Sequence, residues 1–460
     1  MIDSLKRIFS VPELKAKIFV TLVLLAVCRI GSFVPIPGIN VDMAVKVFQQ
    51  ATGGLQNLFQ LVDMFSGGAF AQMTILALGL VPYITASIMM QLLVVVIPSL
   101  QREMQESSDH GRRKMAKWTK TATLLIALVH SGLLGKYALS MDLSYPGIIV
   151  PEMLHLTLFG FPWLFMLTFM TTMTTGTLFL MWIGEQISEK GIGNGVSLII
   201  TVGILSSFPT TLGSIIHQLN LESQGPGSLS LFSLIILCSL FVFVTIATIL
   251  MIQGQRRIPL QHARRIVGRR EVQGSSSYIP LKVNYAGVMP VIFASSFLMF
   301  AATIGRLLGD GPFLDAISGA LAPGNLLYML IFVGMIIFFT YFWTATQFKP
   351  DQIASDMKKN GAFIPGVRQG KPTQDFLEKT MSRITFAGAI FLAFIAILPG
   401  LVEKFLYIDA SLYRFFGGTS LLILVGVILD TTKQVESHLL MKRYDGFMKK
   451  GKAKKTKSLS

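Results

Sequence analysis

Long apolar segments that are almost free of ionisable residues constrain this fold more than any other feature. Of the 460 residues, 52% are hydrophobic and only 14% are charged, whereas soluble proteins have about 25% charged residues. A helix of about 20 apolar residues crosses a hydrocarbon core of about 30 Å. We therefore predict an all-α integral membrane protein with ten transmembrane helices, at residues 18–37, 74–98, 121–139, 162–184, 196–212, 229–252, 286–307, 325–347, 384–402 and 418–433.

The distribution of positive charge predicts the orientation of these helices. With the N-terminus inside, 34 of the 40 lysines and arginines fall in inner loops and tails, which is the bias expected of cytoplasmic segments. Both termini are therefore predicted to be cytoplasmic. Five helices in each half would give two halves of opposite topology, related by an axis in the membrane plane. We divide the chain into an N-terminal half, 1–212, a C-terminal half, 213–435, and a basic tail, 436–460.

The sequence carries no pattern of catalytic residues. It contains no H-E-x-x-H helix, G-x-S-x-G elbow or Walker-type loop, so we predict no enzymatic activity and no metal or cofactor. Cys28 and Cys238 lie in apolar runs and offer neither a disulfide framework nor a thiolate metal site. The run G-I-G-N-G at 191–195 follows no strand of a βαβ unit. We interpret it as a tight turn before the fifth span, with Asn194 as a helix cap.

Two features of the predicted spans require explanation: an interruption of the fifth span and an arginine within the first. Ser206, Ser207 and Pro209 interrupt the fifth span. Arg29 lies deep in the first span without an acidic neighbour there, so we expect it to contact backbone carbonyls or to reach towards the interface. A substrate site at Arg29 is the alternative interpretation. Ion-coupled transporters usually place paired charges inside the membrane, and the scarcity of such charges here argues against a secondary transporter of small solutes.

Two long inner loops, 254–284 and 348–382, hold 13 basic residues, and Arg383 directly follows the second loop. The arginine pairs of the first loop are separated by β-prone residues, which predicts an extended basic hairpin. In the second loop, Pro365 and Gly366 predict a turn that presents Arg368 near its tip. Arginines of this kind suit phosphate and carboxylate partners. Contact with anionic lipid is the alternative, and it suits the tail at 449–457 best.

Sequence motifs along nearly the whole chain resemble the SecY family of protein-conducting channels. They include R-I-G-S-F-V-P-I-P-G at 29–38, M-F-S-G-G at 64–68, G-L-V-P-Y-I-T-A-S at 79–87, G-A-F-I-P-G at 361–366 and G-G-T-S-L-L at 417–422. The resemblance implies two five-helix halves hinged like a clamshell, a hydrophobic constriction, a small plug and a lateral gate. It implies a central pore that passes unfolded, signal-bearing polypeptides across the bacterial inner membrane and releases hydrophobic segments sideways into lipid.

The resemblance also assigns candidate site residues by motif. The pore ring would comprise six aliphatic residues: Leu80, Ile84, Val196, Ile200, Ile292 and Ile423. The plug would lie at about 58–70 and include Phe59, Leu61, Met64, Phe65, Gly67 and Gly68. The helices flanking the lateral gate would carry Pro82, Ser87, Pro290 and Ser295, and we expect the two prolines to bend those helices.

Partners are implied in the same way. SecA and the ribosome would dock on five arginines of the basic loops: Arg256, Arg257, Arg269, Arg270 and Arg368. SecE would clamp the two halves, SecG would lie at the side, and signal peptides, nascent polypeptides and membrane lipids would complete the set of partners. Lys349-Pro350-Asp351 departs from the family pattern, because an acid stands where a base is usual. A scaffold that recruits an RNA-containing particle through its basic loops, without any pore, is the third hypothesis.

Overall fold

A computed structural model describes residues 11–50, 62–100, 102, 108–154, 162–218, 231–262, 265–267, 270–272, 276–307, 325–406 and 418–457. The chain forms two compact units. The first comprises Met1–Ser214, Met299–Pro323 and Val427–Ser460, and the second comprises Ile215–Leu298 and Gly324–Gly426. Each unit is mostly helical, which confirms the predicted all-α membrane fold.

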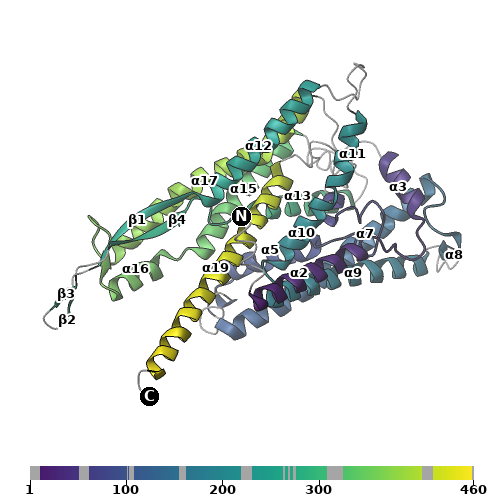
Figure 1. The fold of residues 1–460 in the computed structure, drawn as a ribbon. Helices are drawn as coiled ribbons and strands as arrows, with labels where there is room; N and C mark the ends of the chain where they lie inside the picture. Colours follow the sequence, from purple (N-terminus) through teal and green to yellow (C-terminus); the bar gives the residue numbers. More distant parts are fainter. Residues whose placement is uncertain are drawn as a thin grey trace. The chain divides into compact units, whose positions relative to one another are not determined.

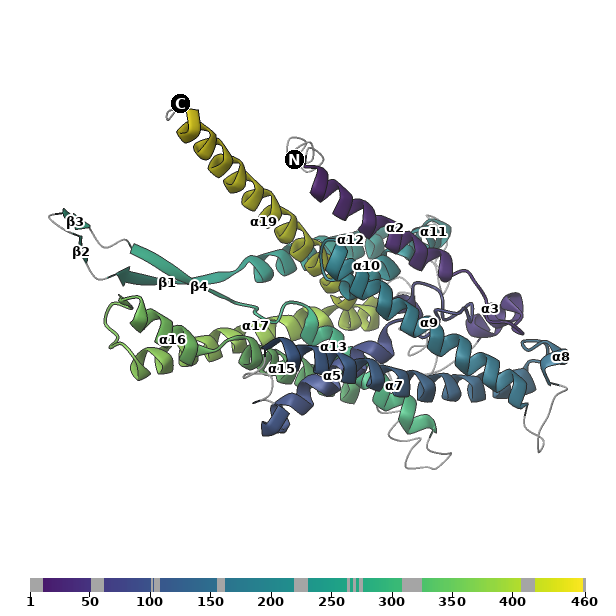
Figure 2. The ribbon, with the colours of Figure 1, turned by 90° about the horizontal axis from the view of Figure 1, so that it is seen from below.

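The first unit is built on long apolar helices that pack side by side. Helix α7 packs against both α5 and α9, and α9 also contacts α2 and α10 (Figures 1 and 2). Pro12 is the first residue of α2. A backbone N–H at that position would have no acceptor within the helix, so a proline there costs no hydrogen bond. The helices of this part of the chain are α2 (Pro12–Gly31), α3 (Val41–Gln50), α5 (Val81–Val96), α7 (Ser108–Ser144), α8 (Pro151–Leu154), α9 (Trp163–Lys190), α10 (Gly195–Ser206) and α11 (Phe208–Gln218).

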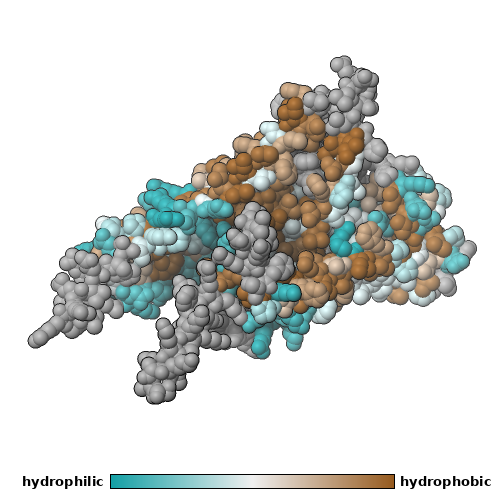
Figure 3. All heavy atoms as spheres, in the orientation of Figure 1, coloured by the Kyte–Doolittle hydropathy of each residue, from teal (hydrophilic) through white to brown (hydrophobic). Residues whose placement is uncertain are grey.

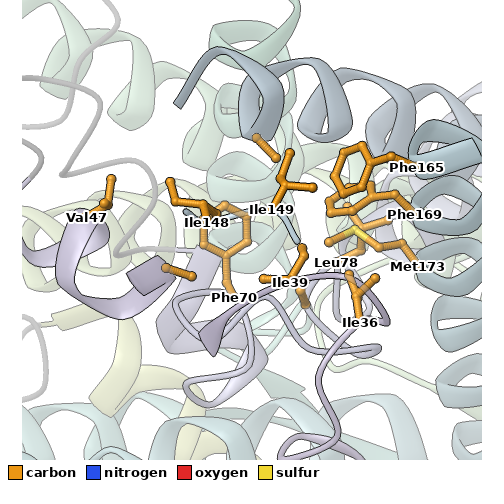
Figure 4. Close-up of a cluster of buried hydrophobic side chains, with 13 residues drawn as sticks. Ile36, Ile39, Val47, Phe70, Leu78, Ile148, Ile149, Phe165, Phe169 and Met173 are labelled. Atoms are coloured by element: carbon orange, nitrogen blue, oxygen red, sulfur yellow. The ribbon is translucent and has the colours of Figure 1, made fainter. Parts of the chain in front are cut away.

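A buried hydrophobic cluster joins the connecting segments of the first unit to its helices. Figure 4 shows Phe70 beside Ile148, with Phe165, Phe169 and Met173 of α9 in the same cluster. Two isolated β-bridges, Pro35 with Thr74 and Ile39 with Ile149, bring these connecting segments together. The chain at Phe70 and Thr74 is therefore fixed in a packed core.

The second unit combines apolar helices with a small sheet. Helix α17 packs against α12, α15 and α16, and the face of α12 in Figure 3 is strongly hydrophobic. The elements are α12 (Leu231–Gln253), β1 (Gln255–His262), β2 (Arg265–Val267), β3 (Arg270–Val272), β4 (Ser276–Lys282), α13 (Met289–Leu307), α15 (Leu326–Gln347), α16 (Pro350–Lys359), β5 (Ala362–Phe363), α17 (Lys371–Leu406) and α19 (Gly418–Lys457). Three sequence boundaries between the two units fall within helices α11, α13 and α19.

Each of the ten predicted spans overlaps a helix, but several boundaries differ. Within the described residues, six helices are both long and apolar enough to cross a membrane. The second span begins its helix at Val81 and not at 74, because 74–80 form turns that end at Gly79 with φ +57°. Helix α17 begins at Lys371 and not at 384, and α19 continues to Lys457. The predicted interruption of the fifth span is confirmed, since Ser207 separates α10 from α11.

Candidate functional site

The candidate plug is a short helical turn followed by two glycines in the left-handed region. Residues 62–66 are helical, and Gly67 and Gly68 follow with φ of +70° and +88°. Only glycine adopts such angles without strain, so this turn requires glycine at both positions. Met64 is buried and Phe65 is partly buried. Phe59 and Leu61 lie outside the described residues.

Hydrogen bonds tie this segment to itself. The Asp63 carboxylate oxygen Oδ1 accepts from the Ala71 N–H at 2.7 Å, and the Asp63 carbonyl accepts from the Gly68 N–H at 2.9 Å. The Ser66 hydroxyl accepts from the Phe70 N–H at 3.1 Å. Asp63 lies between the first two spans, and burial raises the pKa of its carboxyl to about 6, although the bond from Ala71 opposes that shift.

Two side chains from different helices hold the carbonyl oxygen of Gly67. Arg29 Nη1, on α2, donates to it at 3.0 Å. The Ser206 hydroxyl, at the end of α10, lies 3.3 Å from it and shares its single hydrogen with the Gly203 carbonyl, which is 2.6 Å away. The Arg29 guanidinium also lies 5.7 Å from the centroid of the Phe33 ring. The prediction that Arg29 contacts a backbone carbonyl is therefore confirmed. Sequence reasoning noticed Ser206 only as a break in a span and missed this contact.

A small cavity beside this contact brings plug and ring candidates together. It is lined by Arg29, Phe65, Ser66, Leu80, Ile199 and Gly203, among other residues. Phe65 belongs to the candidate plug and Leu80 to the candidate pore ring. Both candidates therefore face the same space within the first unit.

All six ring candidates lie at or just after the start of a helix. Leu80 is the N-cap of α5 and Ile84 lies in its first turn, while Val196 and Ile200 lie in the first two turns of α10. Ile292 and Ile423 hold similar positions in α13 and α19, in the second unit. Five of the six side chains are buried, and Val196 is partly buried: Leu80, Ile84, Ile200, Ile292 and Ile423 are 0–7% exposed.

The predicted proline bends in the gate helices are wrong. Helix α5 begins at Val81 and α13 at Met289, so Pro82 and Pro290 are each the second residue of a helix. A proline there removes no intrahelical hydrogen bond and does not kink the helix. The hydroxyl of Ser87 accepts from the Gln91 amide at 3.2 Å, and that of Ser295 donates to the Ile292 carbonyl at 2.9 Å.

The two basic loops form one sheet, which sequence reasoning did not foresee. The expected hairpin is confirmed, since β1 pairs with β4 in antiparallel register. Strand β5 of the second loop pairs with the other edge of β1, through Gln261 with Phe363 and His262 with Ala362. Both loops bury side chains in one hydrophobic cluster, which includes Ile258, Leu281, Phe348, Ile364 and Leu377. The alternation of apolar residues in β1 was the feature of the sequence that could have indicated this sheet.

The basic candidates lie on or beside this sheet. Arg256 and Arg257 are exposed on β1, and the Arg257 guanidinium lies 4.9 Å from the centroid of the Tyr278 ring. The predicted Pro-Gly turn is confirmed by the hydrogen bond from the Val367 N–H to the Ile364 carbonyl, 3.1 Å long. Arg368 follows that turn and is exposed.

Arg270 lies farther out on the hairpin. The acidic departure in the second loop has a local explanation. Arg270 begins β3, and Arg269 lies outside the described residues. Asp351 lies in the first turn of α16, and Lys358 and Lys359 lie in its last turn. An acid near a helix N-terminus and bases near its C-terminus both stabilise the helix.

Comparison with known proteins identifies the family. A family model described as SecY matches residues 74–432. A protein translocase subunit SecY from Chlamydia trachomatis is 62% identical over 452 residues, covering 98% of this chain and 99% of the relative. The corresponding Escherichia coli K12 protein is 40% identical over 445 residues, covering 96% and 95%.

Solved structures share the fold at low sequence identity. One, from a study of the plug domain of the SecY protein and the closed state of its channel, matches with a TM-score of 0.58 at 20% identity over 92% of each chain. Sec61 in a canine ribosome-channel complex matches with a TM-score of 0.57 at 18% identity, also over 92% of each. This chain is a channel protein of protein translocation and not an enzyme, and it belongs to the SecY family.

Proposed function

We propose that this chain forms the pore through which unfolded, signal-bearing polypeptides cross the bacterial inner membrane. The ring would consist of Leu80, Ile84, Val196, Ile200, Ile292 and Ile423, all aliphatic. An aliphatic collar offers an ion no replacement for its hydration shell and excludes water by dewetting. The same collar tolerates the varied side chains of a passing polypeptide.

The observation that carries this proposal is the cavity shared by Phe65 and Leu80. A plug that seals a pore must contact the constriction, and these two candidates line one space inside the first unit. The left-handed glycines after residue 66 give the segment a point at which the backbone turns sharply. We assign the plug to the part of 58–70 that ends at Gly68.

Sideways release of hydrophobic segments follows from the energetics of membrane insertion. A signal helix with about ten leucine-like residues gains roughly 3 to 6 kcal/mol on entering lipid. We assign the gate to the helices that carry Pro82, Ser87, Pro290 and Ser295. Because both prolines begin their helices, gating would move intact helices and would not unbend kinks.

The three-stranded sheet β4-β1-β5 would form the docking face for cytoplasmic partners. Its exposed Arg256 and Arg257, with Arg368 beyond the nearby turn, suit the carboxylates of SecA and the phosphates of ribosomal RNA. Arg270, at the start of β3, would extend this face along the hairpin, and Arg269 would belong to the same set of docking arginines. SecE and SecG would complete the complex, and the excess of positive charge on one side supports cytoplasmic termini.

The test is secretion of a signal-bearing precursor into vesicles that contain this chain with SecE and SecG, driven by SecA and ATP. Native protein should give protease-protected precursor. Arg368→Glu should reduce protection strongly, whereas Lys371→Glu, an equal charge change at the start of α17, should reduce it less. No protection from an intact native complex would overturn the proposal. Saturable uptake of a small solute would then favour a transporter, and docking of an RNA-containing particle without conductance would favour a scaffold.

A further inference from the structure

Among the described residues, Arg29 and Ser206 contact the backbone of the candidate plug from helices α2 and α10. Arg29, on α2, donates to the Gly67 carbonyl, and the Ser206 hydroxyl, on α10, shares its hydrogen between the Gly67 and Gly203 carbonyls. We call this pair of contacts the plug anchor. The contacts join positions 38 and 139 residues apart in sequence, so they report tertiary structure and not a local turn.

The anchor directs the charge of Arg29 at the Gly67 carbonyl. Among the residues that the structure describes, Arg29 forms no ion pair, and its contacts are the Gly67 carbonyl and the Phe33 ring. A hydrogen bond from a charged donor is stronger than one between neutral groups. Moving Gly67 away would leave a partly buried guanidinium without its acceptor, which is costly.

Glycines allow the backbones to approach closely enough for the anchor to form. A Cβ added to Gly67 would collide with Arg29 Nη1 and lie 2.9 Å from the Gly203 Cα. A Cβ added to Gly203 would lie 2.9 Å from the Phe65 carbonyl oxygen. The backbones of the plug turn and α10 are therefore in direct contact, and the anchor lies beside that contact.

We propose that Arg29 is a positioning residue that sets how readily the plug leaves the closed position, and thereby how hydrophobic a signal must be to open the channel. This inference rests on the proposed function. A signal that binds the open channel loses apparent affinity in proportion to the closed fraction. Weakening the anchor raises the open fraction, so a less hydrophobic segment suffices.

The expected size follows from the chemistry of the contact. Hydrogen bonds to charged groups contribute roughly 1.5 to 3 kcal/mol, which corresponds to a rise of about 10- to 150-fold in the open population when the donor is removed. Ser206 is a neutral donor at a longer distance, so its loss should raise that population by about 10-fold or less.

The experiment measures how fast a thiol on the plug reacts with a membrane-impermeant maleimide. Phe65→Cys serves as the reporter in a Cys28→Ala, Cys238→Ala background, in the complete membrane complex with SecE and SecG. Rates are compared at rest and with a trapped precursor. Arg29→Met removes the donor, and Arg29→Lys keeps the charge with a single ammonium, which gives a second variant should the first fail to assemble.

Matched controls separate the anchor from general destabilisation. Ser207→Ala is the control for Ser206→Ala, because the Ser207 hydroxyl donates only to the Ile204 carbonyl within its own helix region. Lys15→Met, an exposed position on α2, is the control for Arg29→Met. Secretion of a precursor with a shortened signal core is measured in the same vesicles.

The outcomes separate the anchor from the plug itself. The proposal is supported if the resting rate of maleimide modification rises in Arg29→Met, rises less in Ser206→Ala and stays native in both controls. Secretion of the precursor with the shortened signal core by Arg29→Met would also support it. If precursor accelerates modification of the native chain but Arg29→Met and Arg29→Lys leave the resting rate unchanged, the anchor is overturned while the plug stands. If precursor changes nothing, the plug assignment fails and the anchor fails with it.

Discussion

Asp63 makes the stability of the plug turn depend on pH. Burial raises the pKa of its carboxyl from 3.8 to about 6, so the closed turn binds the proton more tightly than an opened, solvated turn does. The free energy of opening therefore falls as the pH rises through the interval between about 4 and 6, and it is nearly constant outside that interval. Acidification should stabilise the closed turn.

The magnitude follows from the two pKa values. Between pH 7 and pH 5 the closed state gains roughly 1 kcal/mol or somewhat more relative to the opened state, which is on the order of a tenfold decrease in opening. The measurement is hydrogen exchange of the segment 62–71 in the membrane complex, corrected for the intrinsic pH dependence of exchange. The Ala71 amide is the most direct probe, since it donates to the titrating carboxyl.

Asp63→Asn is the matched variant, because an amide oxygen can still accept from Ala71 but the side chain no longer titrates. Its corrected exchange should be independent of pH and should resemble that of the native chain at pH 5. Asp63→Leu removes the acceptor and should exchange fast at every pH. An Asp63→Asn profile that keeps the native pH dependence, or native protection that rises with pH, would refute this reasoning.

Three further predictions concern the scaffold around the site. Gly176→Ala should lower the free energy of unfolding by more than 1 kcal/mol in thermal denaturation, because its Cβ would collide with the Ile75 carbonyl; Gly213→Ala, which meets no atom within 4 Å, is the control and should leave stability native or higher. Asn194→Ala should cost about 1 kcal/mol, since Asn194 Oδ1 accepts from the Ser197 N–H; retained stability would contradict the cap. Asp351→Asn should weaken α16 by about 0.5 kcal/mol at low salt, and high salt should remove the difference.

The sequence predicted the features that depend on local chemistry. Hydropathy located the spans, the order of glycine and proline located the turn before Arg368, and the isolation of Arg29 indicated a backbone acceptor. These inferences need only the residue and its immediate chain. The acceptor itself could not be identified, because the Gly67 carbonyl is a backbone atom that every sequence contains.

Features that depend on tertiary contacts were predicted less well. Pro82 indicates a bend only if a helix already precedes it, and the turns at 74–80 place the helix start beside it instead. Strand β5 has two residues, too few for any periodic signal, and it is a strand only because β1 offers an edge. In both cases the neighbouring segment decides the conformation.

The glycine-rich turn at 191–195 shows why the plug turn is the better candidate for movement within the first unit. The Ile192 N–H donates to Thr21 on α2 at 3.1 Å, and the Gly193 and Gly195 N–H groups donate to Gln434 and Ser188 at 3.0 and 2.9 Å. A phosphate bound at this turn would need these backbone N–H groups, but they already donate to side chains of α2, α9 and α19. The plug turn, by contrast, is contacted from other helices by two donors on one carbonyl and from the chain after it by the Phe70 and Ala71 N–H groups, and that chain is fixed in the core at Phe70. Displacement should therefore end at Gly68 and leave the 191–195 turn in place.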